Sequence, residues 1–429
     1  MSSFLARETW LNRWGVFGAV SLAFFFLNLA TFTSLGVVLF TMVAELNWSH
    51  TAAGFSFAFL GLACGLSSPL PAFTVRWLGG RATTCLGALT LLVGFTLSAV
   101  SHGILEFYLA MLFLGLGYSL AGNVPGVYLI AGWFERGAAR VIGLYLMLGA
   151  LGAAIGPPIV EAIVSAVGWR GQWQVMAVAA GILGVVCFAI VRDPKQRSAA
   201  DIGPGLAGPA ALAARQVVWT PRQAIFTSQF ILIAGAMATT MACVTTNSSV
   251  TLNHLVKLGA TPVTGAYVLG AMGFIATMVK ALAGWLSEKI SPTAIVAGGL
   301  VLQSAGNVML AFAATPALQY GSAVIFGTGW GLAYVAGTIA LLNFFGGITG
   351  SRILSIVWLL TSVAAAGPIA AGMIADRYGT FAPIFLVYAV LLLSLATPIL
   401  LMRRPVNRTA EVEAAVSHDG GLVRPMTAI

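Results

Sequence analysis

The sequence predicts an all-α membrane protein with twelve transmembrane helices arranged as two bundles of six. Three observations predict this class. Of the 429 residues, 59% are hydrophobic and only 8% are charged, the mean hydropathy is +0.96, and apolar stretches of the roughly 20 residues that cross a bilayer recur along the chain. These stretches are rich in Gly and Ala and lack the apolar and polar alternation of a membrane barrel strand.

The predicted helices follow one another with short polar connections. They cover residues 16–43, 51–74, 82–101, 105–132, 139–166, 170–191, 224–250, 262–286, 293–313, 317–345, 352–375 and 381–402. The first helix lacks the cleavage site of a signal peptide, so we expect it to be retained. A basic linker rich in Pro, Gly and Ala divides the chain into an N-terminal bundle (1–191), the linker itself (192–223), a C-terminal bundle (224–402) and a polar tail (403–429).

The distribution of basic residues predicts the orientation, because Lys and Arg collect in cytoplasmic loops. With the amino terminus inside, seventeen of the 21 basic residues fall in inner segments, and only Arg170, Lys257 and Arg377 fall in outer ones. We therefore expect both termini in the cytoplasm and a multi-pass protein of the cell inner membrane. The net charge of +9 reflects this topology and requires no nucleic-acid partner.

An internal repeat relates the two bundles with a constant spacing. Positions 211 apart pair Gly156-Pro157 with Gly367-Pro368, Gly168 with Gly379, Trp133-Phe134 with Phe344-Phe345, and Gly54 with Gly265. A repeat without gaps predicts two six-helix halves in parallel relation. Carriers built in this way bind their substrate near the middle of the bilayer, between the halves.

Lys280 is the basic residue that falls inside an apolar span, within residues 271–286. A charge at this depth is costly and typically marks a substrate or ion site. No acidic residue lies near the midpoint of a predicted span, and Glu161, in the outer third of its span, is expected at the outer vestibule or interface. An anionic substrate would supply the missing counter-charge. Alternatively, Lys280 extends to the cytoplasmic interface about two turns away and binds nothing.

The loop Gly284-Trp285-Leu286-Ser287-Glu288-Lys289 resembles the Gly-x-x-x-Asp/Glu-Arg/Lys loop of the major facilitator superfamily, and the resemblance extends over all twelve spans. In that superfamily the acid caps and latches cytoplasmic helix ends. The first-half copy, residues 76–81, lacks the acid. Four segments resemble the oxalate/formate antiporter and monocarboxylate transporter group, namely Glu45-Leu46-Asn47-Trp48-Ser49, Trp133-Phe134-Glu135-Arg136, Gly156-Pro157-Pro158 and Gly168-Trp169-Arg170.

The group carries a carboxylate-binding arginine four residues before the loop glycine, and Lys280 occupies that position. Lysine keeps the charge but loses the planar bidentate fork. Oxalate carriers of the group add a second cation in helix 11, whereas residues 353–375 contain none, so the resemblance implies a monocarboxylate. Proton-coupled members carry an aspartate where this chain has Ala276. Exchange, as in an antiporter, or uniport is therefore favoured over carboxyl-based proton coupling at this position.

Five further residues are candidates for the site. Trp330 and Tyr334 share a face of helix 10, where the resemblance places an aromatic pair in the central cavity, although ordinary helix packing gives the same spacing. Asn123 is the repeat equivalent of Tyr334 at mid-span, and it either bonds a neighbouring helix or faces the cavity. His254, near the end of helix 7, either binds a carboxylate or is a surface histidine. Asn28 in helix 1 is a cavity candidate whose face the sequence does not fix.

These features predict a secondary active transporter of a small organic anion, most simply a monocarboxylate, working by alternating access. Lys280 would neutralise the carboxylate, Asn123, Tyr334, His254 and Asn28 would donate or accept hydrogen bonds, and Trp330 would wall the cavity. No metal cluster, cofactor motif or nucleophile triad occurs, so neither an enzyme nor a bound cofactor is expected. We expect a monomer in the lipid bilayer. The alternatives are an exporter of larger amphipathic compounds or drugs, and a transporter-like sensor.

Overall fold

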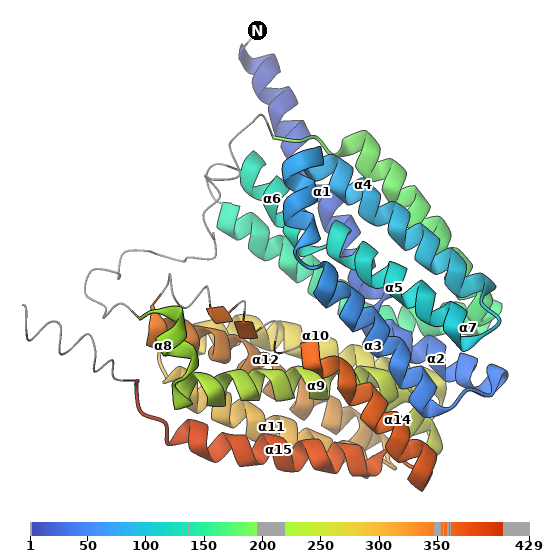
Figure 1. The fold of residues 1–429 in the computed structure, drawn as a ribbon, viewed down its shortest axis with the longest axis vertical. Coiled ribbons are helices and arrows are strands. Elements are labelled where there is room, and N and C mark those ends of the chain that lie inside the picture. Colours follow the sequence, from blue (N-terminus) through green and yellow to red (C-terminus); the bar gives the residue numbers. More distant parts are fainter. Residues whose placement is uncertain are drawn as a thin grey trace, which may run out of the picture.

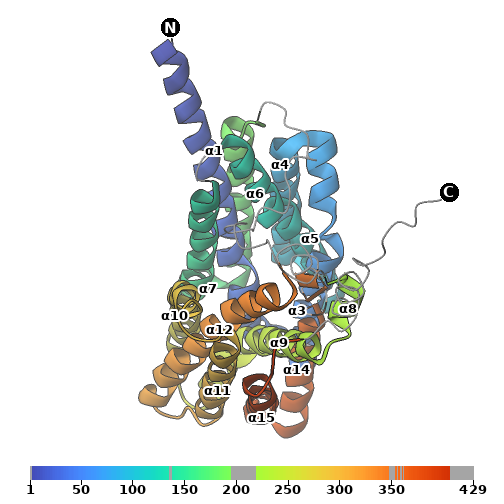
Figure 2. The same cartoon turned by 90° about the vertical axis from the view of Figure 1, so that its left-hand side faces the viewer.

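The computed structural model describes residues 2–134, 138–194, 219–346, 353–354, 356–357, 360 and 362–405. Over these residues the predicted all-α class is confirmed, and no strand occurs. The helices are α1 (Ser2–Ala30), α2 (Phe32–Leu46), α3 (His50–Ser67), α4 (Leu70–Val100), α5 (Ile104–Ala121), α6 (Asn123–Trp133), α7 (Ala138–Ile190), α8 (Pro221–Ile225), α9 (Ser228–Lys257), α10 (Pro262–Leu286), α11 (Pro292–Ala311), α12 (Pro316–Phe345), the 3₁₀ turn η2 (Ser362–Ala365), α14 (Ala366–Tyr378) and α15 (Ala382–Leu400). Figures 1 and 2 show two helical groups, α1–α7 and α8–α15.

Ten helical segments in the described part of the chain are long and apolar enough to cross a membrane. One of them, within α7, contains both predicted spans 139–166 and 170–191, and it bends at Gly168 (φ 74°, ψ 172°). The predicted span 352–375 begins partly outside the described residues and ends in α14. The ten segments are thus consistent with twelve crossings.

Several predicted helices are interrupted or longer than expected. Span 16–43 is divided between α1 and α2 at Thr31, and span 105–132 is divided between α5 and α6 at Gly122 (φ −88°, ψ −137°). The Tyr145 hydroxyl donates to the Gly122 carbonyl at 3.0 Å, which satisfies a carbonyl at the break. The span predicted over residues 224–250 lies largely in α9, which continues to Lys257. That prediction was wrong by about two turns.

Three helix starts that were predicted to within one residue carry a hydroxyl residue followed by proline. Thr261, Ser291 and Thr315 precede Pro262, Pro292 and Pro316, and each hydroxyl accepts a backbone N–H three residues on, at 3.2 to 3.4 Å. The hydroxyl satisfies an N–H that has no partner within the helix, and proline at the first position lacks an N–H that would need one. The starts of α10, α11 and α12 follow directly from these pairs.

Repeat-related glycines make equivalent helix contacts in the two halves. A Cβ on Gly156 would lie 2.7 Å from the Leu29 carbonyl oxygen, and a Cβ on Gly367 would meet the Thr246 hydroxyl. The first part of α7 thus packs on α1 in the first half as α14 packs on α9 in the second. Gly168 and Gly379 also share a positive φ, 74° and 73°. The repeat is therefore visible in the helix packing.

The two halves meet through α2 on α9, α3 on α14 and α7 on α10. Glycines permit close approach at these crossings: a Cβ on Gly54 would lie 2.5 Å from the Pro368 carbonyl oxygen, and one on Gly270 would lie 2.7 Å from that of Ala154. We call the end that carries residues 46–50 and 376–379 the closed end. The halves diverge toward the opposite end, which carries α8 and the start of α1 (Figure 1).

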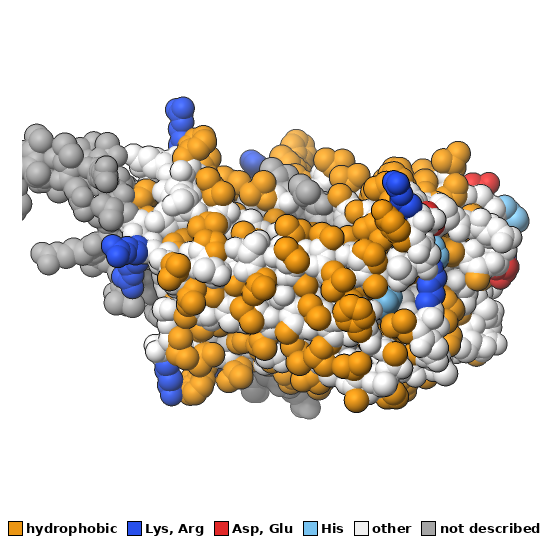
Figure 3. Space-filling model, turned by 90° about the horizontal axis from the view of Figure 1, so that it is seen from below, with side chains coloured by type: hydrophobic (Ala, Val, Ile, Leu, Met, Phe, Trp, Pro, Cys, Tyr) orange, Lys and Arg blue, Asp and Glu red, His pale blue; other side chains and the backbone are white. Residues whose placement is uncertain are grey.

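The surface of the molecule fits a bilayer. On the face in Figure 3, hydrophobic side chains cover the middle of the molecule, while Lys and Arg lie toward both ends and Asp, Glu and His lie near one end. Val390 and Leu393 on α15 are 68% and 51% exposed. Such broad apolar exposure suits contact with lipid rather than water.

Candidate functional site

Lys280 lies on α10, and its ammonium is held against two aromatic faces of α12. Lys280 Nζ is 4.6 Å from the Trp330 ring centroid and 5.0 Å from that of Tyr334. The predicted shared face of Trp330 and Tyr334 is thereby confirmed. Glycine at position 331 permits the close approach of α10 and α12, since a Cβ there would lie only 2.7 Å from the Ala276 carbonyl oxygen. The side chain of Lys280 turns toward α12 and is partly buried.

Among the described residues, Lys280 forms no ion pair with a carboxylate. The ion pair in this part of the chain lies elsewhere and joins Arg170 to Glu45. The negative faces of the two rings therefore give Lys280 its nearest favourable electrostatic partners. The Trp330 indole nitrogen is buried and has no hydrogen-bond acceptor within the described part of the chain. A cation and an N–H donor thus lie next to each other. Such a pair can bind an anion through charge and hydrogen bonding.

The N-terminal half contributes Asn28 and a residue that the sequence analysis missed, Tyr118. The Tyr118 hydroxyl donates to Asn28 Oδ1 at 3.1 Å, and Asn28 Nδ2 donates to the Phe24 carbonyl at 2.7 Å. Tyr118 could have been found by its place near the midpoint of span 105–132, the criterion that selected Asn123.

Asn123 does not occupy the predicted middle of a continuous helix. It is the first residue of α6, directly after the break at Gly122, and its side chain is exposed and forms no hydrogen bond with another described residue. The break changes the direction of the chain. The repeat relation to Tyr334 therefore does not translate into an equivalent environment.

His254 lies inside the C-terminal half and is only 1% exposed, so the interpretation as a surface histidine is wrong. Its Nε2 is 3.0 Å from the Leu310 carbonyl oxygen, and its ring centroid is 4.8 Å from that of Phe385. The ring is held among α9, α11 and α15, whereas Lys280 turns toward α12. Because α9 continues past the predicted helix end, the histidine is carried into the bundle.

Two acidic residues also have unexpected surroundings. Glu161 is 8% exposed and accepts a hydrogen bond from Ser165 at 2.7 Å, so it is buried rather than interfacial. Asp193, which follows α7, accepts the backbone N–H groups of Gly80 and Arg81, the latter at 3.3 Å. The acid missing from the first-half loop motif is therefore supplied by a distant part of the chain, and it caps the helical segment after Gly79.

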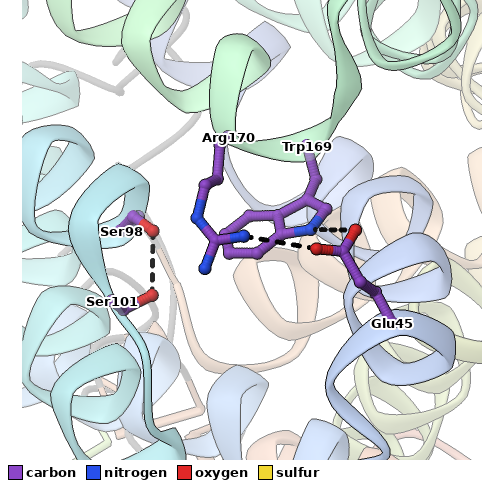
Figure 4. Close-up of polar contacts among 5 residues, drawn as sticks. All are labelled: Glu45, Ser98, Ser101, Trp169 and Arg170. Carbon is purple, nitrogen blue, oxygen red and sulfur yellow. Dashed lines mark hydrogen bonds and ion pairs between the residues drawn. The ribbon is translucent and has the colours of Figure 1, made fainter.

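Two of the segments that carry the family resemblance meet at the closed end. Figure 4 shows the Glu45 carboxylate joined by dashed lines to both the Trp169 indole and the Arg170 guanidinium. Trp169 Nε1 donates to Glu45 at 2.8 Å, Arg170 pairs with Glu45 at 3.3 Å, and the Arg170 guanidinium carbon is 4.0 Å from the Trp169 ring centroid. These contacts fix the end of α2 to the bend of α7. They give the two motifs a structural role within the first half.

Residues 20–366 match the Major Facilitator Superfamily along most of the chain. The chain belongs to this superfamily. Members of the superfamily are membrane transporters, so this major facilitator protein is a multi-pass transporter and not an enzyme. The predicted superfamily and its all-helical fold of about ten to twelve membrane helices are confirmed by the match together with the fold.

Three curated relatives align with part of this major facilitator chain. The probable L-galactonate transporter of Escherichia coli (strain K12) is 30% identical over 36% of the chain and 33% of its own length. The inner membrane transport protein RhmT of the same organism is 33% identical over 30% of the chain and 29% of its own length. Monocarboxylate transporter 12 of Mus musculus is 26% identical over 30% of the chain and 26% of its own length. The alignments thus span a third or less of these relatives.

Solved structures resemble the chain over nearly its whole length. The nucleoside transporter NupG (D323A mutant) has a TM-score of 0.74 at 13% identity and covers 91% of this chain and 99% of its own. A POT family transporter in complex with 5-aminolevulinic acid has a TM-score of 0.70 at 14% identity, over 90% and 95%. At these identities the likeness establishes the fold alone.

Proposed function

We propose that this transporter carries a small organic monocarboxylate by alternating access, with Lys280 as the counter-ion of the carboxylate. The observation that supports this most directly is the ammonium of Lys280 against Trp330 and Tyr334, unpaired with any carboxylate of the described residues. A lone buried cation at membrane depth is costly and is favoured where function requires it. A single cation neutralises a single carboxylate and leaves a dianion under-compensated.

The neighbouring groups have separate parts in this proposal. Trp330 walls the site and directs its indole N–H, which lacks an acceptor among the described residues, toward the bound carboxylate. Tyr334 holds the ammonium in place through its ring face. Asn28, oriented by Tyr118, presents polar atoms from the other half. A substrate that contacts Lys280 and its aromatic neighbours in one half and Asn28 in the other would couple the movements of the two halves.

Asn123 stays a prediction, as an exposed amide beside the helix break. His254 has no part in the proposed site, because its ring nitrogen is engaged by Leu310. The names of two relatives support the substrate class, since L-galactonate and the substrates of a monocarboxylate transporter are carboxylates. This support is limited to the aligned third of those proteins.

The test is carboxylate binding by purified Lys280→Ala, Lys280→Arg and the parent protein, measured by isothermal titration across a panel of lactate-sized and larger monocarboxylates. Removing one partner of a buried ion pair costs about 3–5 kcal/mol, so Lys280→Ala should weaken binding by about 100-fold or more. Lys280→Arg should retain substantial binding. Lys289→Ala is the matched control, because Lys289 also lies over an aromatic ring, 4.0 Å from Trp285, but is exposed at the helix end.

Dicarboxylates in the same assay should compete far less well than monocarboxylates. Parental binding by Lys280→Ala, or tight binding of oxalate, would contradict the proposal. Tight binding of large amphipathic compounds that is unaffected by Lys280→Ala would favour an exporter instead. Uptake of labelled substrate into liposomes that hold the parent protein separates a carrier from a sensor.

A further inference from the structure

The Asp376 carboxylate, at the end of α14 in the second half, caps the first turn of α3 in the other half. Asp376 Oδ1 accepts the His50 N–H at 2.9 Å, and Oδ2 accepts the Thr51 N–H at 2.9 Å and the Thr51 hydroxyl at 2.6 Å. The positions are more than 320 residues apart in the chain. A carboxylate at a helix N-terminus satisfies N–H groups that have no partner within the helix, and it is favoured by the helix dipole.

A second set of contacts surrounds this cap. Lys257, at the end of α9, donates to the Gly379 carbonyl at 3.1 Å, and its Nζ lies 3.5 Å from His50 Nε2. The Phe381 ring, 1% exposed, lies under both groups, with its centroid 5.1 Å from that of His50 and 4.9 Å from Lys257 Nζ. Residues from three segments of the second half thus hold the start of α3.

These contacts can exist only while the halves touch at the closed end. In alternating access the halves must part there for the site to face the other side of the membrane. Parting would return the Asp376 carboxylate and two backbone N–H groups to water. The side chain of Ser49 caps α3 from its own half by accepting the Ala52 N–H at 3.1 Å, so α3 keeps one cap when Asp376 leaves.

We propose that Asp376 is an interdomain latch: its carboxylate stabilises the closed-end state by capping α3 across the two halves, and its release accompanies opening at that end. The proposal concerns the conformational equilibrium and holds whatever the substrate is. Hydrogen bonds to a charged group contribute more than neutral ones, although Asp376 is exposed and water competes. We expect loss of the carboxylate charge to raise the ratio of open to closed molecules at this end about tenfold.

The experiment measures distances across the closed end by pulsed electron spin resonance in lipid nanodiscs without added substrate. Spin labels are attached at Ala44→Cys on α2 and Ala317→Cys on α12, both exposed positions in opposite halves, after the four native cysteines are replaced by alanine. Asp376→Asn should populate a longer distance at this end. Thr51→Val, which removes one of the three hydrogen bonds, should give a smaller shift in the same direction.

Glu106→Gln is the matched control. Glu106 also accepts a backbone N–H at a helix start, from His102 at 2.8 Å, but donor and acceptor lie in the same half. It should leave the distance distribution unchanged. The latch is ruled out if Asp376→Asn and Thr51→Val both give the parental distribution, or if Glu106→Gln shifts it equally. The result is independent of carboxylate binding, so failure of the latch and failure of the Lys280 site are distinguishable.

Discussion

Two of the helix crossings that join the halves, α3 on α14 and α7 on α10, are related by the internal repeat, yet they are held together differently. At the α3–α14 crossing, Asp376 of one half caps the helix start at His50 and Thr51 of the other. At the α7–α10 crossing, the positions 211 residues away are Ser165 in place of Asp376 and Thr261-Pro262 in place of His50-Thr51. Proline has no N–H to donate, and Thr261 caps α10 from within its own helix.

Among the described residues, no side-chain hydrogen bond links α7 to α10 at that second crossing. Ser165 donates instead to Glu161 on its own helix, and the crossing is formed by close backbone contact at Gly270 and Ala154. One crossing therefore combines close packing with a charged cap, and the other relies on packing alone. Sequence divergence at three positions is enough to make two symmetric contacts energetically unequal.

The largest effect should come from disrupting the close packing at α3–α14. A Cβ on Gly372 would meet the His50 carbonyl and lie 2.6 Å from the Thr51 Cα, and backbone atoms cannot move aside cheaply. Gly372→Ala should separate this crossing, lengthen the distance between the labels at positions 44 and 317, and cost about 1–3 kcal/mol of stability. Gly298→Ala is the control, because nothing lies within 4 Å of its added Cβ. Equal behaviour of the two variants in label distance and thermal unfolding would show that the crossing tolerates separation.

Much of this architecture could be predicted from local sequence, because its causes are local. Apolar length gave the twelve spans, and the predicted starts at 262, 293 and 317 fall within one residue of the starts of α10, α11 and α12. Lys280 was identified by its charge within an apolar span. Trp330 and Tyr334 followed from helical spacing, and the structure brings all three together.

The parts that could not be predicted depend on contacts between distant segments. Nothing in the sequence near Asp376 indicates that its partners lie at His50 and Thr51. The burial of His254 was not predicted, because its hydrogen-bond partner is a main-chain carbonyl on another helix, and the side chains of the sequence do not reveal such a partner. The helix break beside Asn123 was not predicted, because a repeat offset cannot report a change in backbone geometry such as that at Gly122.

A smaller effect is expected from introducing the missing cap at the α7–α10 crossing. Pro262→Thr restores a backbone N–H at the start of α10, and Ser165→Asn supplies an acceptor without placing a second carboxylate beside Glu161. Neither change alone completes the bond, so the two together should show a favourable coupling of about 1 kcal/mol in a double-mutant cycle of stability. The control is a second cycle in which Pro262→Thr is combined with Ser165→Ala, which supplies no acceptor. Strict additivity with Ser165→Asn would mean that the side chains at these repeat positions do not meet as they do at α3–α14.

The smallest effect should come from removing the cap that α10 already has. Thr261 accepts the Thr264 N–H at 3.2 Å within its own helix, and replacing a threonine cap by alanine typically costs about 1 kcal/mol. Thr261→Ala should therefore lower the thermal stability slightly, and Thr261→Ser, which keeps the hydroxyl, should restore most of it. Because this cap joins no residue of the other half, the label distance at the closed end should equal that of the parent. A longer distance in Thr261→Ala, comparable to that of Asp376→Asn, would mean that capping either helix controls the interface, and the contrast between the two crossings would be lost.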